Sequence, residues 1–133
     1  MKDSNKAEVI KYRLKQAQTA LDDAQFLLEG KRSPQSIVNR SYYAMFYAVL
    51  ALLEKIEKIP SKHSGAISLF DKEFVQKGIF PKELSRSLHK AFEARQVADY
   101  KILEVPDQNK AEEIFKEAKE FVEKVKNYLT EKN

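Results

Sequence analysis

The sequence predicts an all-α protein, an antiparallel up-and-down bundle of about five helices. Apolar residues recur at three- and four-residue spacing through most of the 133 residues, and no segment shows the two-residue alternation of a strand. The chain contains only 3 Gly and 4 Pro, which favours long helices over many short strands. A hydrophobic content of 43% is sufficient for one core, so we expect a single domain over residues 1–133.

The composition also argues against several classes of function. There is no Cys, which excludes disulfides and thiolate metal sites, and 2 His are too few for a His-rich metal site. No apolar run approaches the roughly 20 residues of a membrane span, and residues 1–6 lack the apolar stretch of a signal peptide. We therefore expect a cytoplasmic protein with no membrane contact, metal or cofactor. The net charge is +4. Lys and Glu interleave along the chain, a pattern that is typical of solvated helices.

The first two helices are predicted over about residues 6–29 and 34–56. The first has a continuous apolar stripe and ends at Gly30, a suitable C-terminal cap. The second begins with Ser33 as N-cap and Pro34 as its first residue. Its apolar face is wide enough to place it at the centre of the bundle, and comprises Val38, Tyr42, Met45, Phe46, Val49, Leu52, Leu53 and Ile56.

Three further helices complete the predicted bundle. The third covers about residues 64–76, with Ile67, Phe70 and Phe74 directed inward. Gly78 and Pro81 separate it from a fourth helix over about residues 82–98. The last helix covers about residues 110–130, and its apolar positions recur at near-heptad spacing, as in an antiparallel bundle.

Arg95 occupies a position where the fourth helix should be apolar. It shares one helical face with Leu84, Leu88, Ala91 and Phe92. Because a guanidinium keeps its proton, it must be paired, hydrated in a cleft or held for a ligand. We expect Arg95 to pair with Asp99, four residues later, or with the second helix, and the Tyr100 hydroxyl could bond the same carboxylate. The alternative is a cleft in which the Arg fork grips a phosphate.

The second predicted helix carries another candidate region. Tyr43 and Tyr47 lie four residues apart and flank its apolar face, together with Arg40. These aromatic rings either pack at an interface or core edge, or stack on bases beside a phosphate-binding Arg. A face this wide, with two flanking tyrosines, exceeds what one small bundle needs to bury, and so predicts a homodimer.

The two histidines differ in their surroundings. His63 stands at the start of the third helix, where it either takes part in capping or contacts a phosphate as an anion-binding or acid–base group. His89 lies on a mostly polar flank between Arg86 and Glu93, and we expect an ordinary surface His.

Four segments together resemble the HEPN domain family, small all-α bundles common in prokaryotes. They are residues 41–48 (SYYAMFYA), 62–65 (KHSG), 70–75 (FDKEFV) and 92–100 (FEARQVADY). The resemblance covers most of the chain and implies a dimer whose groove lies near Arg95. Many members of the family act as metal-independent ribonucleases through an Arg followed, after four to six residues, by a His. Others pair with a minimal nucleotidyltransferase encoded beside them in toxin–antitoxin modules.

This chain lacks the His of that motif. Arg95 resembles the Arg, but residues 100–102 are Tyr, Lys and Ile, and neither His follows an Arg at the required spacing. We therefore expect a non-catalytic or weakly active module that binds a nucleotidyltransferase partner, or RNA or nucleotide. The alternative is a metal-independent endoribonuclease toxin in which Tyr100 or His63 replaces the missing group. The expected cleft comprises Arg95, Asp99, Tyr100, Arg40, Tyr43, Tyr47 and His63.

Overall fold

The computed structural model describes the backbone of residues 2–100 and 106–131 and the side chains of residues 5–96 and 106–131. Within these ranges every regular element is helical, which confirms the predicted all-α class. The elements are α1 (Lys2–Glu29), α2 (Pro34–Lys55), α3 (His63–Phe70), a π-helical turn η1 (Asp71–Val75), α4 (Lys82–Tyr100) and α5 (Gln108–Thr130). None of these described helices has the length and apolarity needed to cross a membrane.

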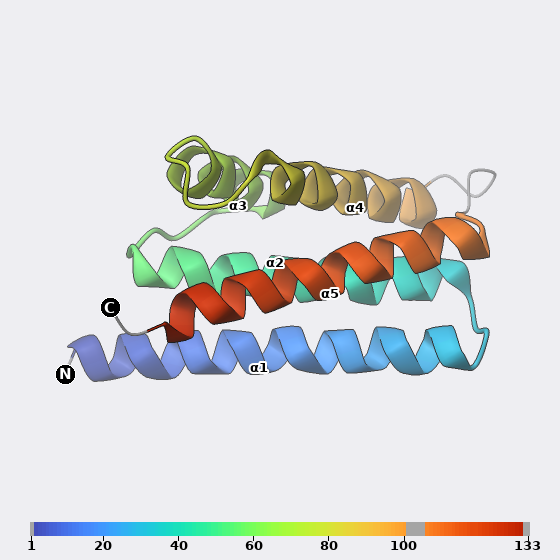
Figure 1. Cartoon of the computed structure of the whole chain (residues 1–133), viewed down its shortest axis with the longest axis horizontal. Helices are drawn as coiled ribbons and strands as arrows, with labels where there is room; N and C mark the ends of the chain where they lie inside the picture. The colour runs from blue at the N-terminus through green and yellow to red at the C-terminus, as the bar shows by residue number, and fades with distance from the viewer. Residues whose placement is uncertain (1, 101–105, 132–133) are drawn as a thin grey trace.

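The helix α2 lies at the centre of the bundle, as its composition predicts. It contacts α1, α3, α4 and α5. Figure 1 shows it with α1 on one side and the layer of α3 and α4 on the other, and the long helices alternate in direction along the chain. The start of α2 also follows the prediction, because Pro34 is its first residue and the Ser33 hydroxyl accepts a hydrogen bond from the Ser36 amide at 3.3 Å.

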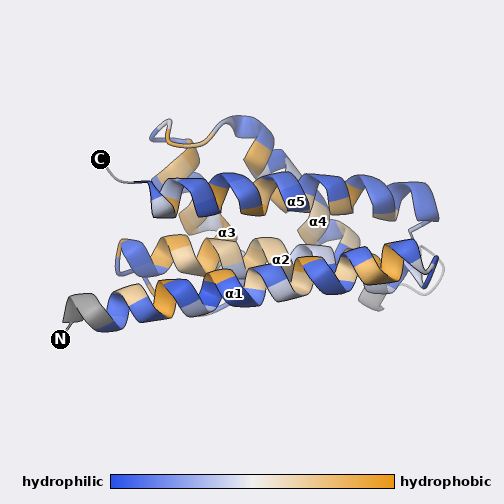
Figure 2. Ribbon diagram, turned by 60° about the horizontal axis from the view of Figure 1, so that its bottom comes forward, coloured by the Kyte–Doolittle hydropathy of each residue, from blue (hydrophilic) through white to orange (hydrophobic). Residues whose placement is uncertain are grey.

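The helix α5 shows the division between buried and exposed faces most clearly. In Figure 2 its hydrophobic residues lie along the side that faces the other helices, and its hydrophilic residues cover the outer side. On the edge of α5 toward α4, Glu113 and Glu117 form ion pairs with the Lys90 ammonium at 2.8 and 3.1 Å. Leu129, which the helical period also predicts to face inward, is half-buried. The other predicted inner positions are buried, namely Ala111, Ile114, Phe115, Ala118, Phe121, Val122 and Val125.

The predicted third helix is divided by a π-helical turn. Its α-helical part ends at Phe70, and in η1 the Gln76 amide donates to the Asp71 carbonyl at 2.8 Å, five residues earlier. Phe70 and Phe74 are both buried, with ring centroids 6.1 Å apart. The apolar spacing therefore continues across the turn, which is why the sequence pattern does not reveal it.

His89 is exposed as expected, but it is also bonded to this turn. Its Nε2 lies 2.6 Å from one carboxylate oxygen of Asp71. The other oxygen accepts a hydrogen bond from the Ser85 hydroxyl at 2.7 Å. Since Ser85 and His89 both belong to α4, Asp71 fixes α4 against η1.

The chain turns back at the end of α2 through a residue in the left-handed conformation. Glu57 has φ 58°, and the Lys58 amide donates to the Leu53 carbonyl at 2.9 Å. The same arrangement follows α1, where the left-handed residue is Lys31 (φ 51°) rather than the predicted cap Gly30. The hydrogen bonds to otherwise unpaired carbonyls offset the roughly 1–2 kcal/mol that this conformation costs a non-Gly residue.

Truncation of the centre of α2 tests this account of stability. Leu52 is fully buried, so Leu52→Ala should lower the free energy of unfolding by about 2–5 kcal/mol, through lost burial and the cavity left behind. The measurement is urea denaturation followed by circular dichroism. Lys116→Ala on the exposed side of α5 serves as the control and should change stability by less than about 0.5 kcal/mol. Equal effects of the two substitutions would contradict the central role of α2.

Candidate functional site

Arg95 reaches from α4 to α2. Its Nη1 donates a hydrogen bond to the Tyr43 hydroxyl at 2.9 Å. Its guanidinium carbon lies 5.2 Å from the ring centroid of Tyr42 and 5.6 Å from that of Tyr43. The partly buried cation is thus held by a hydroxyl and two aromatic rings. This confirms the predicted pairing with the second helix, whereas the side chains of Asp99 and Tyr100 lie outside the described residues.

His63, the first residue of α3, lies in the same cluster. Its ring stacks on Phe46, with centroids 4.1 Å apart and planes inclined by 3°. Its Nδ1 lies 2.8 Å from the Tyr42 hydroxyl, and the tautomer of His63 decides which of the two donates. Tyr42 is fully buried, so its hydroxyl requires a polar partner, and His63 provides it.

The electrostatics of the cluster keep His63 and Tyr42 neutral at pH 7. Burial, and in second place the Arg95 cation, hold the pKa of His63 below its ordinary value of 6.5. Burial raises the pKa of Tyr42 well above its ordinary value of 10.0, although the Arg95 charge opposes this shift. The cluster therefore combines a neutral imidazole, a neutral phenol and a guanidinium that keeps its charge.

Arg40 brings a second guanidinium to Tyr43. Its guanidinium carbon lies 5.3 Å from the Tyr43 ring centroid, and its Nε and Nη2 donate to the Asn39 side-chain oxygen at 3.1 and 3.0 Å. Tyr47 packs on Tyr43 with ring centroids 5.9 Å apart, and together with Arg40 it borders a pocket of about 340 Å³ beside α1. His63 meets Tyr43 edge to face at 5.7 Å. Tyr43 is thus the residue around which the described members of the predicted set meet.

Sequence reasoning placed Tyr42 and Phe46 in the core and missed their contacts with the site. Tyr42 touches both Arg95 and His63, and Phe46 carries the His63 ring. Phe92, which precedes Arg95 by one turn of α4, lies 5.7 Å from the Tyr42 ring. One signal was available, because a Tyr at a fully buried position needs a polar partner for its hydroxyl.

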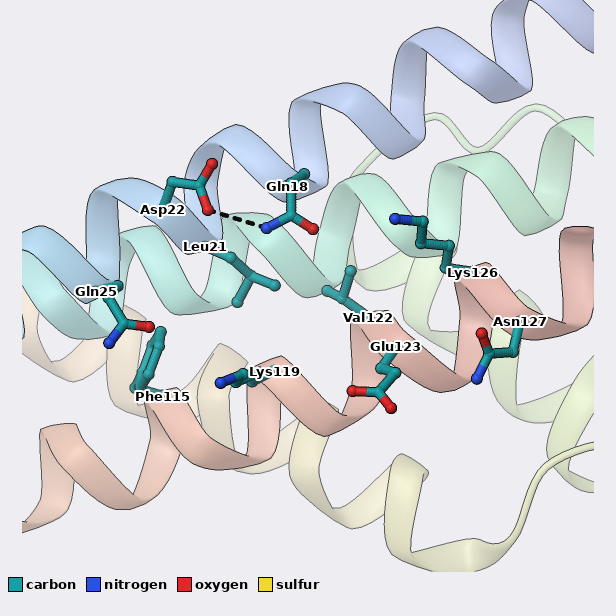
Figure 3. A pocket seen from close by; sticks show the side chains of 10 residues that line it. All are labelled: Gln18, Leu21, Asp22, Gln25, Phe115, Lys119, Val122, Glu123, Lys126 and Asn127. Atoms are coloured by element: carbon teal, nitrogen blue, oxygen red, sulfur yellow. Dashed lines mark hydrogen bonds between the residues drawn. The ribbon is translucent and has the colours of Figure 1, made fainter.

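A second groove, between α1 and α5, shares no residue with this cluster. It has a volume of about 390 Å³, and Figure 3 shows side chains from both helices lining it. Lys119 and Lys126 are matched there by Asp22 and Glu123, so the groove offers an anion no net attraction. In the parts of the chain that the structure describes, no three His, Asp or Glu side chains gather closely enough to hold a metal ion.

The position of His63 makes its titration a test of the cluster. In an NMR titration, we expect the midpoint of His63 protonation to lie below pH 6.5. Arg95→Gln should raise the His63 pKa only part of the way back to 6.5, because the burial of the ring remains. The His63 ring is harder to protonate in the folded chain than in the unfolded chain. The free energy of unfolding is therefore highest above about pH 6.5 and decreases as pH falls. His63→Gln should remove that part of the pH dependence of unfolding. A His63 pKa at or above 6.5 would contradict the arrangement.

Comparison with known proteins assigns the family. The sequence model of the HEPN domain family matches residues 10–128. A UPF0332 protein of Thermotoga maritima is 37% identical over 127 residues, which cover 95% of this chain and 89% of that protein. "Putative toxin MJ0142" of Methanocaldococcus jannaschii is 40% identical over 96 residues (72% of this chain, 65% of that protein), and "Putative toxin MJ0605" is 35% identical over 115 residues (86% and 84%). These matches confirm the resemblance in residues 41–100, and the chain belongs to the HEPN domain family.

Proposed function

We propose that this chain is the HEPN module of a toxin–antitoxin system, and that it binds the phosphate of RNA or a nucleotide at Arg95. The relatives named as toxins support the class of system. The single observation that carries the binding role is the convergence of two guanidinium groups on one aromatic ring. Arg95 and Arg40 lie 5.6 and 5.3 Å from the Tyr43 centroid.

The chemistry of these groups suits a nucleotide. A guanidinium presents paired N–H donors that match two phosphate oxygens, and it keeps its charge at any physiological pH. The rings of Tyr43 and Tyr47 offer faces on which a base can stack. The Tyr43 hydroxyl fixes the direction of the Arg95 fork, which reduces the entropy lost when a phosphate binds.

The proposal includes two protein partners. A minimal nucleotidyltransferase is the partner that the family resemblance implies. A second copy of the chain is supported also by α1, on which Tyr12 and Phe26 are large apolar residues with exposed fractions of 58% and 75%. The wide apolar face of α2 is weaker support for a homodimer than its composition suggests, because four helices of the same chain cover it.

A second candidate function is metal-independent cleavage of RNA, and the position of His63 favours it. The motif His is absent after Arg95, but the fold places another imidazole beside the same Tyr42 ring. A neutral imidazole is able to accept a proton from a ribose hydroxyl at pH 7. We rank this function second because the His of the family motif is absent after Arg95. Burial also holds the pKa of His63 below its ordinary value, which reduces the share of imidazolium that could protonate a leaving group.

The dimer is tested by mass. Light scattering at micromolar concentration should give about twice the chain mass of 15.4 kDa. Tyr12→Ser together with Phe26→Ser should shift the mass toward the monomer if α1 contributes to the contact. A wild-type mass near 15.4 kDa would contradict the homodimer.

The binding role is tested with Arg95→Ala and the matched loss of a charge in Lys116→Ala. Because Arg95 is oriented and partly buried, its removal should weaken binding of a labelled oligoribonucleotide at least about tenfold. Loss of Lys116, an exposed Lys that pairs with Glu112, should have a much smaller effect. Fluorescence anisotropy at fixed salt, in the presence of a chelator, measures both. Equal affinities of Arg95→Ala and the wild type would overturn the proposal.

The same samples, incubated with structured and unstructured RNA, report cleavage. We expect little or none. Robust cleavage in chelator that is lost in both Arg95→Ala and His63→Gln would make the ribonuclease the better assignment.

A further inference from the structure

A pocket of about 320 Å³ opens beside His63, between α1, the second half of α2 and the connection to α3. The left-handed turn at Glu57 directs the chain so that residues 58–62 form its outer wall. Its volume falls at the low end of the range of about 300–1,000 Å³ for small-molecule sites. Apart from His63, none of the residues predicted as functional lines it.

One part of the pocket lining is apolar and partly aromatic. Phe46, Leu50, Leu53 and Pro60 contribute to the lining, together with the His63 ring that stacks on Phe46. Flat heterocycles bind in such surroundings, because aromatic and aliphatic side chains accept the faces of any base. This part of the lining therefore favours a planar, weakly polar group.

The rim of the pocket is cationic. Arg13, Lys58 and Lys62 line it, against the single carboxylate of Glu54. Arg13 is bonded to a neutral partner, the Gln16 side-chain oxygen, at 2.9 Å. The excess positive charge favours a ligand that carries an anion beside its planar group, whereas an uncharged apolar peptide would gain nothing from it.

The pocket and the Arg95 cluster share the stacked rings of His63 and Phe46. The His63 ring centroid lies 5.8 Å from that of Tyr42, over which Arg95 is placed. We propose that this pocket is a nucleoside subsite, which receives the base of the nucleotide whose phosphate is held at Arg95. The subsite rests on the proposed function and places the base on Phe46, Leu50 and His63 in the pocket, with Lys62 at the rim. The base then lies in this pocket instead of on the rings of Tyr43 and Tyr47.

The test compares two probes that differ only in the base, adenosine 5′-monophosphate and ribose 5-phosphate, by isothermal titration calorimetry. The wild type should bind the nucleotide about tenfold more tightly, within the range reported for stacking of one base. Leu50→Trp fills the pocket and should abolish this preference while leaving the affinity for ribose 5-phosphate unchanged. Leu28→Trp, at a half-buried position of α1 outside the pocket, is the matched control and should keep the preference.

A second variant keeps the test independent of how well Leu50→Trp folds. Lys58→Gln with Lys62→Gln changes only exposed side chains and should weaken binding of the nucleotide several-fold. Equal wild-type affinities for the two probes, or a preference that survives both sets of substitutions, would overturn the subsite. If nucleotide binding still depends on Arg95 in that case, only the subsite fails. If neither probe depends on Arg95, the proposed function fails with it.

Discussion

The burial of α2 on nearly all sides is the constraint on which the rest of the structure depends. Each neighbouring helix has to bury only one apolar stripe, whereas α2 must be covered by four elements at once. On a helix in that position, a buried polar group is costly unless a neighbouring group satisfies it. The fully buried Tyr42 is such a case, and its hydroxyl is met by His63 at 2.8 Å. The candidate site therefore forms where the most buried helix exposes its aromatic edge.

Arg95 shows how a cation is tolerated on an apolar helical face. Removing a guanidinium from water is costly unless hydrogen bonds and compatible surfaces replace the lost hydration. Tyr43 supplies a hydroxyl at 2.9 Å, and the rings of Tyr42 and Tyr43 supply their faces. Arg95 therefore keeps its positive charge, and this charge is what would attract an anionic ligand.

The helical period predicted the fold because every long helix has a regular apolar face. Local exceptions escaped it: the π-helical turn preserves the apolar spacing, and the left-handed residues Lys31 and Glu57 are not the Gly that usually marks such a turn. The sequence also predicted that Arg95 would need a partner, in Asp99 or in the second helix. The approach of His63 to Tyr42 was beyond reach, since it depends on how α3 packs on α2 across 21 residues of chain.

The residues of the site belong to elements that separate when the chain unfolds. The bond between Arg95 and Tyr43 joins positions 52 residues apart, so no single helix can reproduce it. A ligand that needs both groups cannot bind the unfolded chain, and it therefore shifts the folding equilibrium by mass action. At a hundred times its Kd such a ligand adds roughly 2.7 kcal/mol to the free energy of unfolding. The melting temperature of this small bundle thus reports occupancy directly, for any compound in a collection and without a label or a known reaction.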